Sequence, residues 1–127
     1  MTSKYLFTLA ALLGCTAAAD IAPTVVLHGI TDSCDKMAHV TNTICDSLPE
    51  TTPCKCVEIG GGYWASIFEK MDWQVATACR KIKNDSDFAG KEINVIGFSQ
   101  GGLLARSVVE RCDDLSVHTL MTWGGPH

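Results

Sequence analysis

A glycine-flanked serine between an apolar run and a helical pattern constrains the fold of this chain more than any other feature. The apolar residues at 93–96 predict a buried strand that extends to Phe98, and apolar residues at helical spacing follow over 103–109. Between them stands Gly97-Phe98-Ser99-Gln100-Gly101, a G-x-S-x-G motif. In that context the motif is typical of a nucleophile elbow, a cramped strand-to-helix turn that presents a serine hydroxyl. Ser99 is therefore the candidate nucleophile, and an ordinary loop serine flanked by glycines is the alternative.

Predicted strands and helices alternate along the chain. We predict strands over 24–27, 56–59, 93–98 and 117–123, and helices over 37–48, 72–83 and 103–109. No Asn-Gly or Asp-Gly hairpin turn joins the strands, so we expect a parallel sheet with crossover helices, an α/β fold. The strand at 24–27 is apolar throughout, which predicts a place in the middle of the sheet. Because the sequence ends just past a strand, residues 20–127 are expected to be the N-terminal part of a larger domain.

The first 19 residues have the pattern of a secretory signal peptide. Lys4 precedes an apolar stretch at 5–13, and Ala17-Ala18-Ala19 offers a small-residue cleavage site. The apolar stretch is too short to span a bilayer, and no later segment is apolar enough to do so. A retained N-terminal helix and a lipoprotein site at Cys15 are the alternatives. We therefore expect a product without a transmembrane segment that enters the secretory pathway.

Composition and charge exclude several classes of protein. Hydrophobic residues make up 46% of the chain and charged residues 19%, so it can fill a core and disorder is not expected. The net charge of −4 and the lack of a basic run remove the electrostatic basis for nucleic-acid binding. Loss of Cys15 with the signal peptide would leave six of the seven cysteines, an even number that fits disulfides in an oxidising compartment.

A serine nucleophile needs donors for the oxyanion that its attack creates. The backbone N–H of Gln100, at the start of a helix, is one predicted donor. The N–H of Ile30, in the His28-Gly29-Ile30 turn after the first strand, is the other. His28 is expected to orient this turn rather than to act as the base, because hydrolases with this elbow take their histidine from late in the chain.

The sequence lacks a well-placed base and acid to complete a catalytic triad. After Ser99 the histidines are His118, expected to be a packed or edge-strand residue, and the terminal His127. The acidic residues Asp113 and Asp114 are expected to be a solvated helix end. Loss of a triad histidine lowers turnover by about a million-fold, so this chain alone is expected to be nearly inactive. We expect no cofactor and no catalytic metal.

Several stretches resemble the palmitoyl-protein thioesterases, enzymes that remove fatty acyl groups from cysteine. They are 28–34, 57–60, Gln74-Val75 with Cys79, 96–102, Arg106, 110–112 and 123–127. The Phe-Ser-Gln-Gly-Gly core with a downstream Arg-Cys is more specific than a general hydrolase elbow. The resemblance runs from about residue 24 to 127. It implies the first part of an α/β-hydrolase three-layer sandwich, truncated after the strand that follows the elbow.

By this resemblance Ser99 is the nucleophile, and Gln100 and Ile30 supply the oxyanion amides. It also implies a disulfide between Cys79 and Cys112. The triad Asp and His, and most of the acyl-binding groove, fall in a second half that this sequence does not contain. The implied substrates are S-acylated proteins or peptides and fatty acyl thioesters, and the implied location is the lysosome or the extracellular space. A secreted lipase or carboxyl esterase and a non-catalytic, disulfide-stapled binding module are the alternative functions.

The sequence departs from the family pattern at two places. Thr31 stands where the family commonly has Gly, so the oxyanion turn is expected to follow a different backbone path. Four cysteines have pairings that the sequence leaves open, with local disulfides and a zinc site as the alternatives. They are Cys34, Cys45, Cys54 and Cys56. The triplet Asn84-Asp85-Ser86 is an acceptor for N-glycosylation at Asn84.

Overall fold

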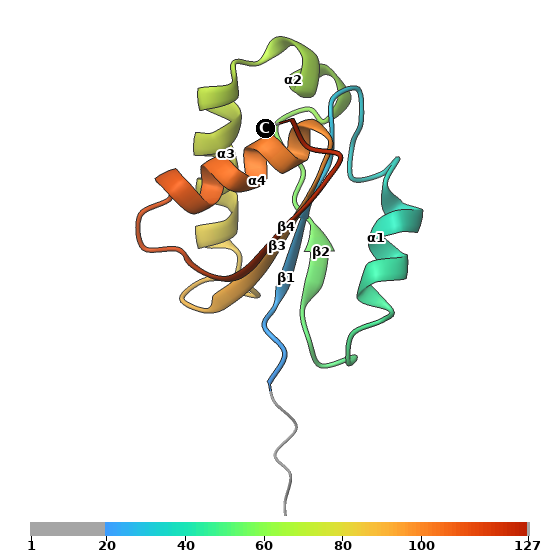
Figure 1. Ribbon diagram of the computed structural model, residues 1–127, viewed down its shortest axis with the longest axis vertical. Helices are drawn as coiled ribbons and strands as arrows, with labels where there is room; N and C mark the ends of the chain where they lie inside the picture. The colour runs from blue at the N-terminus through green and yellow to red at the C-terminus, as the bar shows by residue number, and fades with distance from the viewer. Residues whose placement is uncertain (1–19, 127) are drawn as a thin grey trace, which may run out of the picture.

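Four parallel strands and four helices make up the computed structural model of this chain, which describes residues 20–126 (Figure 1). The strands are β1 (Thr24–Leu27), β2 (Cys54–Cys56), β3 (Glu92–Phe98) and β4 (Ser116–Trp123). The helices are α1 (Ala38–Cys45), α2 (Tyr63–Phe68), α3 (Met71–Asn84) and α4 (Gln100–Arg111). The signal peptide predicted over residues 1–19 lies outside the described residues.

The strand order in the sheet is β2-β1-β3-β4, and every neighbouring pair is parallel. Each connection between successive strands contains at least one helix, as parallel pairing requires. β1 lies between β2 and β3 and all four of its residues are buried, which confirms the predicted mid-sheet position. The predicted α/β class and parallel sheet are therefore confirmed.

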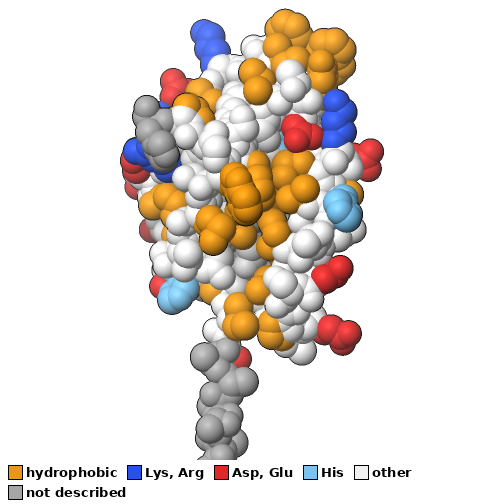
Figure 2. Space-filling view, turned by 45° about the vertical axis from the view of Figure 1, so that its right-hand side comes forward, with side chains coloured by type: hydrophobic (Ala, Val, Ile, Leu, Met, Phe, Trp, Pro, Cys, Tyr) orange, Lys and Arg blue, Asp and Glu red, His pale blue; other side chains and the backbone are white. Residues whose placement is uncertain are grey.

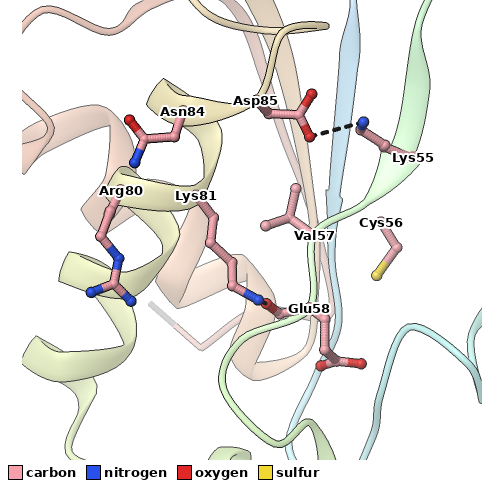
Figure 3. Close-up of a pocket in the computed structure, with 8 residues that line it drawn as sticks. All are labelled: Lys55, Cys56, Val57, Glu58, Arg80, Lys81, Asn84 and Asp85. Carbon is pink, nitrogen blue, oxygen red and sulfur yellow. Dashed lines mark hydrogen bonds and ion pairs between the residues drawn. The ribbon is translucent and has the colours of Figure 1, made fainter.

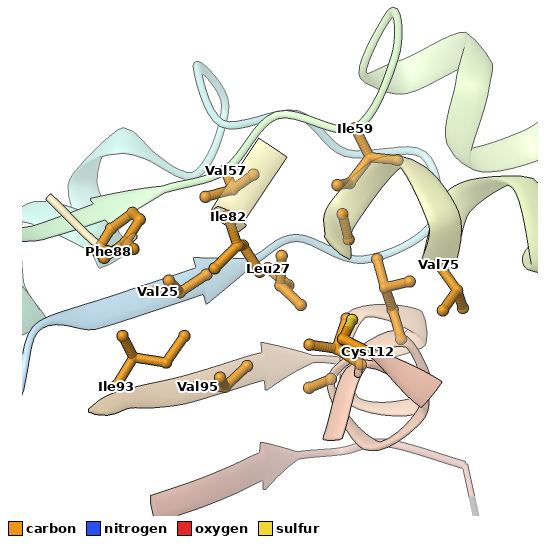
Figure 4. Packing of buried hydrophobic residues seen from close by; sticks show 14 residues of the cluster. Val25, Leu27, Val57, Ile59, Val75, Ile82, Phe88, Ile93, Val95 and Cys112 are labelled. Atoms are coloured by element: carbon orange, nitrogen blue, oxygen red, sulfur yellow. The ribbon is translucent and has the colours of Figure 1, made fainter. Parts of the chain in front are cut away.

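The helices form layers on the two faces of the sheet. α3 and α4 lie on one face, and α1 lies on the other beside β2 (Figure 1). The core fills the space between the sheet and the α3–α4 layer, where strand residues such as Val25 and Val95 meet helix residues such as Ile82 (Figure 4). This arrangement is the predicted three-layer sandwich. It brings the carboxyl ends of β1 and β3 side by side at one edge, because Leu27 pairs with Gly97.

Most predicted elements differ from the structure by one to three residues at an end, and one helix was not predicted. The strand expected over 56–59 is β2, Cys54–Cys56, because the chain leaves the sheet after the Val57 N–H donates to the Val26 carbonyl. The helix expected over 37–48 is shorter, Ala38–Cys45, and ends in successive turns rather than at Pro49. α2 has six residues, too few for a helical repeat to be visible in sequence.

Three disulfides join the described cysteines. Cys34–Cys56 and Cys45–Cys54 attach the segment around α1 to β2. These local disulfides are one of the two alternatives that the sequence left open. The other, a zinc site, is wrong because the four sulfurs are bonded in two pairs. The third disulfide joins Cys79 of α3 to Cys112 after α4, the pair that the resemblance implies.

Candidate active site

Ser99 forms the turn between β3 and α4 in a backbone conformation that L-residues seldom adopt. Its φ is 53° and its ψ is −123°. The surrounding contacts hold it there: its N–H donates to the Trp123 carbonyl of the neighbouring strand at 2.9 Å. Conformations of this kind cost on the order of 1–3 kcal/mol and concentrate at functional sites. The Ser99 side chain is exposed at the carboxyl edge of the sheet, where it is open to a substrate.

The glycines of the motif make this turn sterically feasible. A Cβ on Gly97 would lie 2.1 Å from the Gly101 carbonyl oxygen. A Cβ on Gly101 would lie 2.4 Å from the carbonyl oxygens of both Leu27 and His28. Both distances are shorter than any real contact of a methyl group, so α4 packs against β1 and β3 only because these positions lack a side chain. This is the cramped bend that the motif predicted.

The His28-Gly29-Ile30 turn lies directly against Ser99. A Cβ on Gly29 would be 3.0 Å from the Ser99 Cβ and 3.6 Å from its Oγ. Within residues 20–126, no group accepts a hydrogen bond from the Ile30 N–H. The Gln100 N–H is the first of α4, where backbone donors have no partner inside the helix. The structure thus brings the three predicted site residues, Ser99, Gln100 and Ile30, to one edge of the sheet.

His28 is buried and both of its ring nitrogens are engaged. Its Nε2 lies 2.6 Å from Glu58 Oε1, and its Nδ1 lies 3.0 Å from the Gly29 carbonyl oxygen. These contacts agree with the predicted role of orienting the turn. The sequence did not single out Glu58. No local pattern marks it, because its contact with His28 spans 30 positions of the sequence.

Thr31 shows how the oxyanion turn accommodates a threonine. Its φ is 59°, in the left-handed region that glycine adopts freely, so a glycine would fit the same backbone. The expected diversion of the chain at this position is therefore not required. The Thr31 N–H donates to Ser66 Oγ at 2.9 Å, and Ser66 Oγ in turn donates to the Tyr63 carbonyl. The turn thus rests on α2, the helix that the sequence did not predict.

Within residues 20–126, no histidine makes a hydrogen bond with the Ser99 hydroxyl, and His39 is exposed on α1. His28 is engaged as above, and His118 is exposed on the outer strand β4, 3.5 Å from Glu92. His118 is therefore an edge-strand residue, as expected. His127 lies outside the described residues. Among residues 20–126, no group of three or more His, Cys, Asp or Glu side chains is arranged to hold a metal ion.

An exposed ion-pair cluster lies away from the Ser99 turn, where β2 meets the end of α3 (Figure 3). Lys55 Nζ lies 2.8 Å from both Asp85 Oδ2 and Asp87 Oδ2. Hydrogen bonds to these two carboxylates raise the pKa of Lys55, and the bond from Lys55 lowers the pKa of Asp85. Asn84, the predicted glycosylation acceptor, is exposed beside this cluster as the last residue of α3.

An apolar hollow of about 360 Å³ lies next to the Ser99 turn, on the face of the sheet opposite α3 and α4. Phe98 and Trp123 stack at one side of it, with ring centroids 6.1 Å apart. Figure 2, seen from the α1 side of the molecule, shows hydrophobic side chains gathered in the middle of this view. As for membrane insertion, the described part of the chain has no helix that is both long enough and apolar enough to cross a bilayer.

Comparison with known proteins places the whole described fold within one family. The family model described as palmitoyl protein thioesterase matches residues 23–127. The chain is 36% identical over 104 residues to palmitoyl-protein thioesterase 3 of Dictyostelium discoideum, covering 82% of this chain and 35% of that protein. It is 32% identical over 122 residues to the lysosomal thioesterase PPT2 homolog of Drosophila melanogaster, covering 93% of this chain and 41% of that protein. This chain thus spans well under half the length of these curated relatives.

Proposed function

Because this chain belongs to the palmitoyl protein thioesterase family, we propose that it carries the nucleophile and oxyanion donors of a hydrolase that cleaves fatty acyl thioesters of protein cysteines. The observation that carries the proposal is the Ser99 turn, with φ at 53° and the hydroxyl exposed against Gly29. The catalytic triad is completed by an Asp and a His from outside the described residues. Residues 20–126 thus provide the nucleophile and the oxyanion donors, but not the acid and base of the triad.

In the proposed reaction, Ser99 Oγ attacks the thioester carbonyl carbon while a base takes its proton. The carbonyl oxygen becomes an oxyanion, which accepts hydrogen bonds from the N–H groups of Gln100 and Ile30. Each such donor is worth about 3–4 kcal/mol of barrier. Collapse of the intermediate breaks the carbon–sulfur bond and leaves an acyl-serine. The cysteine departs as a thiolate, and because a thiol has a pKa of about 8.5 this leaving group needs little help from an acid. Water then attacks the acyl-serine and releases the fatty acid.

The substrates are S-acylated proteins or peptides, as the names of the relatives indicate. Delivery to the secretory pathway, and to the lysosome or the extracellular space, is part of the proposal. It is supported by the signal pattern at 1–19 and the three disulfides, which persist in oxidising compartments. N-glycosylation at Asn84 would accompany this route, since the side chain is exposed.

The test is to express the complete open reading frame that encodes this chain, together with its Ser99→Ala variant. We expect the parent to hydrolyse a palmitoyl thioester and the variant to lose about a million-fold in turnover, as when a triad member is removed. An oxygen ester of the same chain length, offered beside the thioester, separates a thioesterase from a lipase or carboxyl esterase. Equal turnover by parent and variant would end the proposal, and a folded, secreted, inert parent would favour the binding-module alternative.

A further inference from the structure

The Glu58 carboxylate is the meeting point of three contacts, all within hydrogen-bond distance. Its Oε1 lies 2.6 Å from His28 Nε2 and accepts a hydrogen bond from the Ile59 N–H at 3.1 Å. Its Oε2 accepts a hydrogen bond from the Cys34 N–H at 2.8 Å. Gly62 leaves room for this carboxylate, since a Cβ there would come within 3.1 Å of Glu58 Cδ. Both carboxylate oxygens are thus engaged, although Glu58 belongs to no helix or strand.

These contacts span residues 28–34, which are the oxyanion turn and the four residues that follow it. Glu58 contacts His28 at the first position of this segment and Cys34 at the last, so one side chain holds both of its ends. The Cys34–Cys56 disulfide holds the far end a second time, to β2. The backbone of Glu58 is held as well, because Lys81 Nζ donates a hydrogen bond to the Glu58 carbonyl oxygen at 2.6 Å (Figure 3). In this figure the carboxylate points away from the Lys55–Asp85 pair.

The His28 ring links the Glu58 carboxylate to the peptide group between Gly29 and Ile30. Both ring nitrogens face oxygen atoms: Nδ1 lies 3.0 Å from the Gly29 carbonyl oxygen and Nε2 lies 2.6 Å from Glu58 Oε1, so the ring is held on both sides. The Gly29 carbonyl belongs to the same planar peptide as the Ile30 N–H, and in a trans peptide these two groups point in opposite directions. Fixing the carbonyl therefore fixes the direction of the N–H. No cis peptide bond occurs in the described chain.

We infer that Glu58 is a positioning residue that acts through His28 to set the orientation of the Gly29–Ile30 peptide, and with it the Ile30 oxyanion donor. This inference rests on the proposed hydrolase function. The His28 side chain is 3% exposed and that of Glu58 33%, so the buried ring depends on the carboxylate as its partner inside the fold. Without the carboxylate, the ring and the peptide lose their fixed orientation, and the donor is misplaced in both the acylation and deacylation steps.

The experiment compares Glu58→Gln with the parent in the complete open reading frame, on a palmitoyl thioester. We expect kcat to fall about 100-fold, since a misplacement of 1 Å is worth about that much, with KM nearly unchanged. The concentration of active sites is measured by fluorophosphonate labelling, and kcat is calculated from it. Unfolded protein therefore does not lower the kcat of the variant. The matched control is Glu92→Gln, which removes the carboxylate from the exposed His118–Glu92 pair and should leave kcat unchanged.

Each outcome separates this inference from the proposed function. If Ser99→Ala keeps parental turnover, the proposed function is wrong and Glu58 has no oxyanion to position. If Ser99→Ala is inactive while Glu58→Gln keeps parental kcat, or changes only KM, the positioning role alone is wrong. Should Glu58→Gln not fold, His28→Gln removes the same link from its other end. Parental kcat in that variant would likewise overturn the inference, and a matching loss of kcat would support it.

Discussion

At the scale of single residues, the site depends on positions where a side chain is absent. Ser99 adopts its strained φ because β3 and α4 approach closely on either side of it, and that approach requires Gly97 and Gly101. The energy of the strained serine is offset by packing elsewhere in the fold. The glycines therefore shape the Ser99 turn through geometry alone.

Replacing Gly101 by alanine should unfold or severely destabilise the chain. The new methyl group would stand 2.4 Å from two carbonyl oxygens of buried backbone, which cannot move aside. We expect a loss of at least about 3 kcal/mol in the free energy of unfolding, at the upper end of overpacking penalties. The control is Gly61→Ala, because nothing lies within 4 Å of a Cβ at that position. Urea unfolding monitored by tryptophan fluorescence measures both, and an equal effect of the two substitutions would contradict the prediction.

The sequence predicted Ser99 but not Glu58, for a physical reason. The elbow is a local pattern, in which five consecutive residues define the turn and its neighbours in the chain define the strand and helix. The role of Glu58 arises from a contact with His28 across 30 positions, which only the pairing of β1 with β2 brings together. Thr31 is similar: its support by Ser66 depends on a helix that periodicity could not detect.

At the scale of elements, the sequence predicted best the strands and helices with a clear apolar pattern. β3 and α3 were located to within one residue at each end because their apolar residues repeat over several alternations or turns. β2 has three residues, all partly exposed, and its central Lys55 gives no strand pattern. Its place in the sheet is secured instead by disulfides from the α1 segment. The cross-links thus compensate for an element that its own sequence specifies weakly.

The three disulfides should differ in what they contribute to stability. In the chain-entropy model a cross-link stabilises more when it closes a longer loop. Cys79–Cys112 has a separation of 33 residues and Cys45–Cys54 a separation of 9. We expect Cys79→Ala with Cys112→Ala to cost about 3–4 kcal/mol, and the equivalent change of Cys45–Cys54 about 1 kcal/mol less. Denaturant unfolding of the two double variants checks this order, and the reverse order would show that native packing, not loop length, dominates.

The ion pairs of Lys55 should add a small amount to the free energy of unfolding, and only within a limited pH range. The pKa of Asp85 lies below its ordinary 3.8 in the folded chain, so its contribution is complete above that pH and is lost as the pH falls through the lowered value. The pKa of Lys55 lies above its ordinary 10.5, so its contribution is complete below that pH and is lost as the pH rises through the raised value.

Because these side chains are partly exposed, Lys55→Met should cost less than about 1 kcal/mol at neutral pH. The difference from the parent should shrink as the solution is made strongly acidic, and it should also shrink in high salt. Lys91→Met, at an exposed lysine outside this cluster, is the control. Urea unfolding across the acidic range measures the difference, and a constant difference down to the lowest pH would show that Lys55 acts through its ammonium group, 5.3 Å from the centroid of the Phe88 ring, rather than through the carboxylates.

At the scale of the whole molecule, the two faces of the sheet are covered unequally. Parallel sheets occur with both faces covered. Here α3 and α4 cover one face, whereas α1 covers the other only near β2 (Figure 1). The part of that second face formed by β3 and β4 carries exposed apolar side chains, including Met121 and Trp123, which are 49% and 69% exposed. The sequence predicted the sheet but not this asymmetry, because the alternation of elements does not say which face each helix takes.

This uncovered face should make the isolated 20–127 segment bind apolar dyes and self-associate. A contiguous apolar surface recruits partners more strongly than scattered apolar residues do, and Met121 and Trp123 line one hollow together with Phe98. We expect the double substitution Met121→Ser and Trp123→Ser to reduce dye fluorescence by roughly half and to shift sedimentation toward the monomer. The control is Trp64→Ser with Phe68→Ser, an exposed aromatic pair on α2. Because that pair lies outside the hollow, an equal effect of both double variants would mean that exposed area alone, and not the uncovered sheet, drives association.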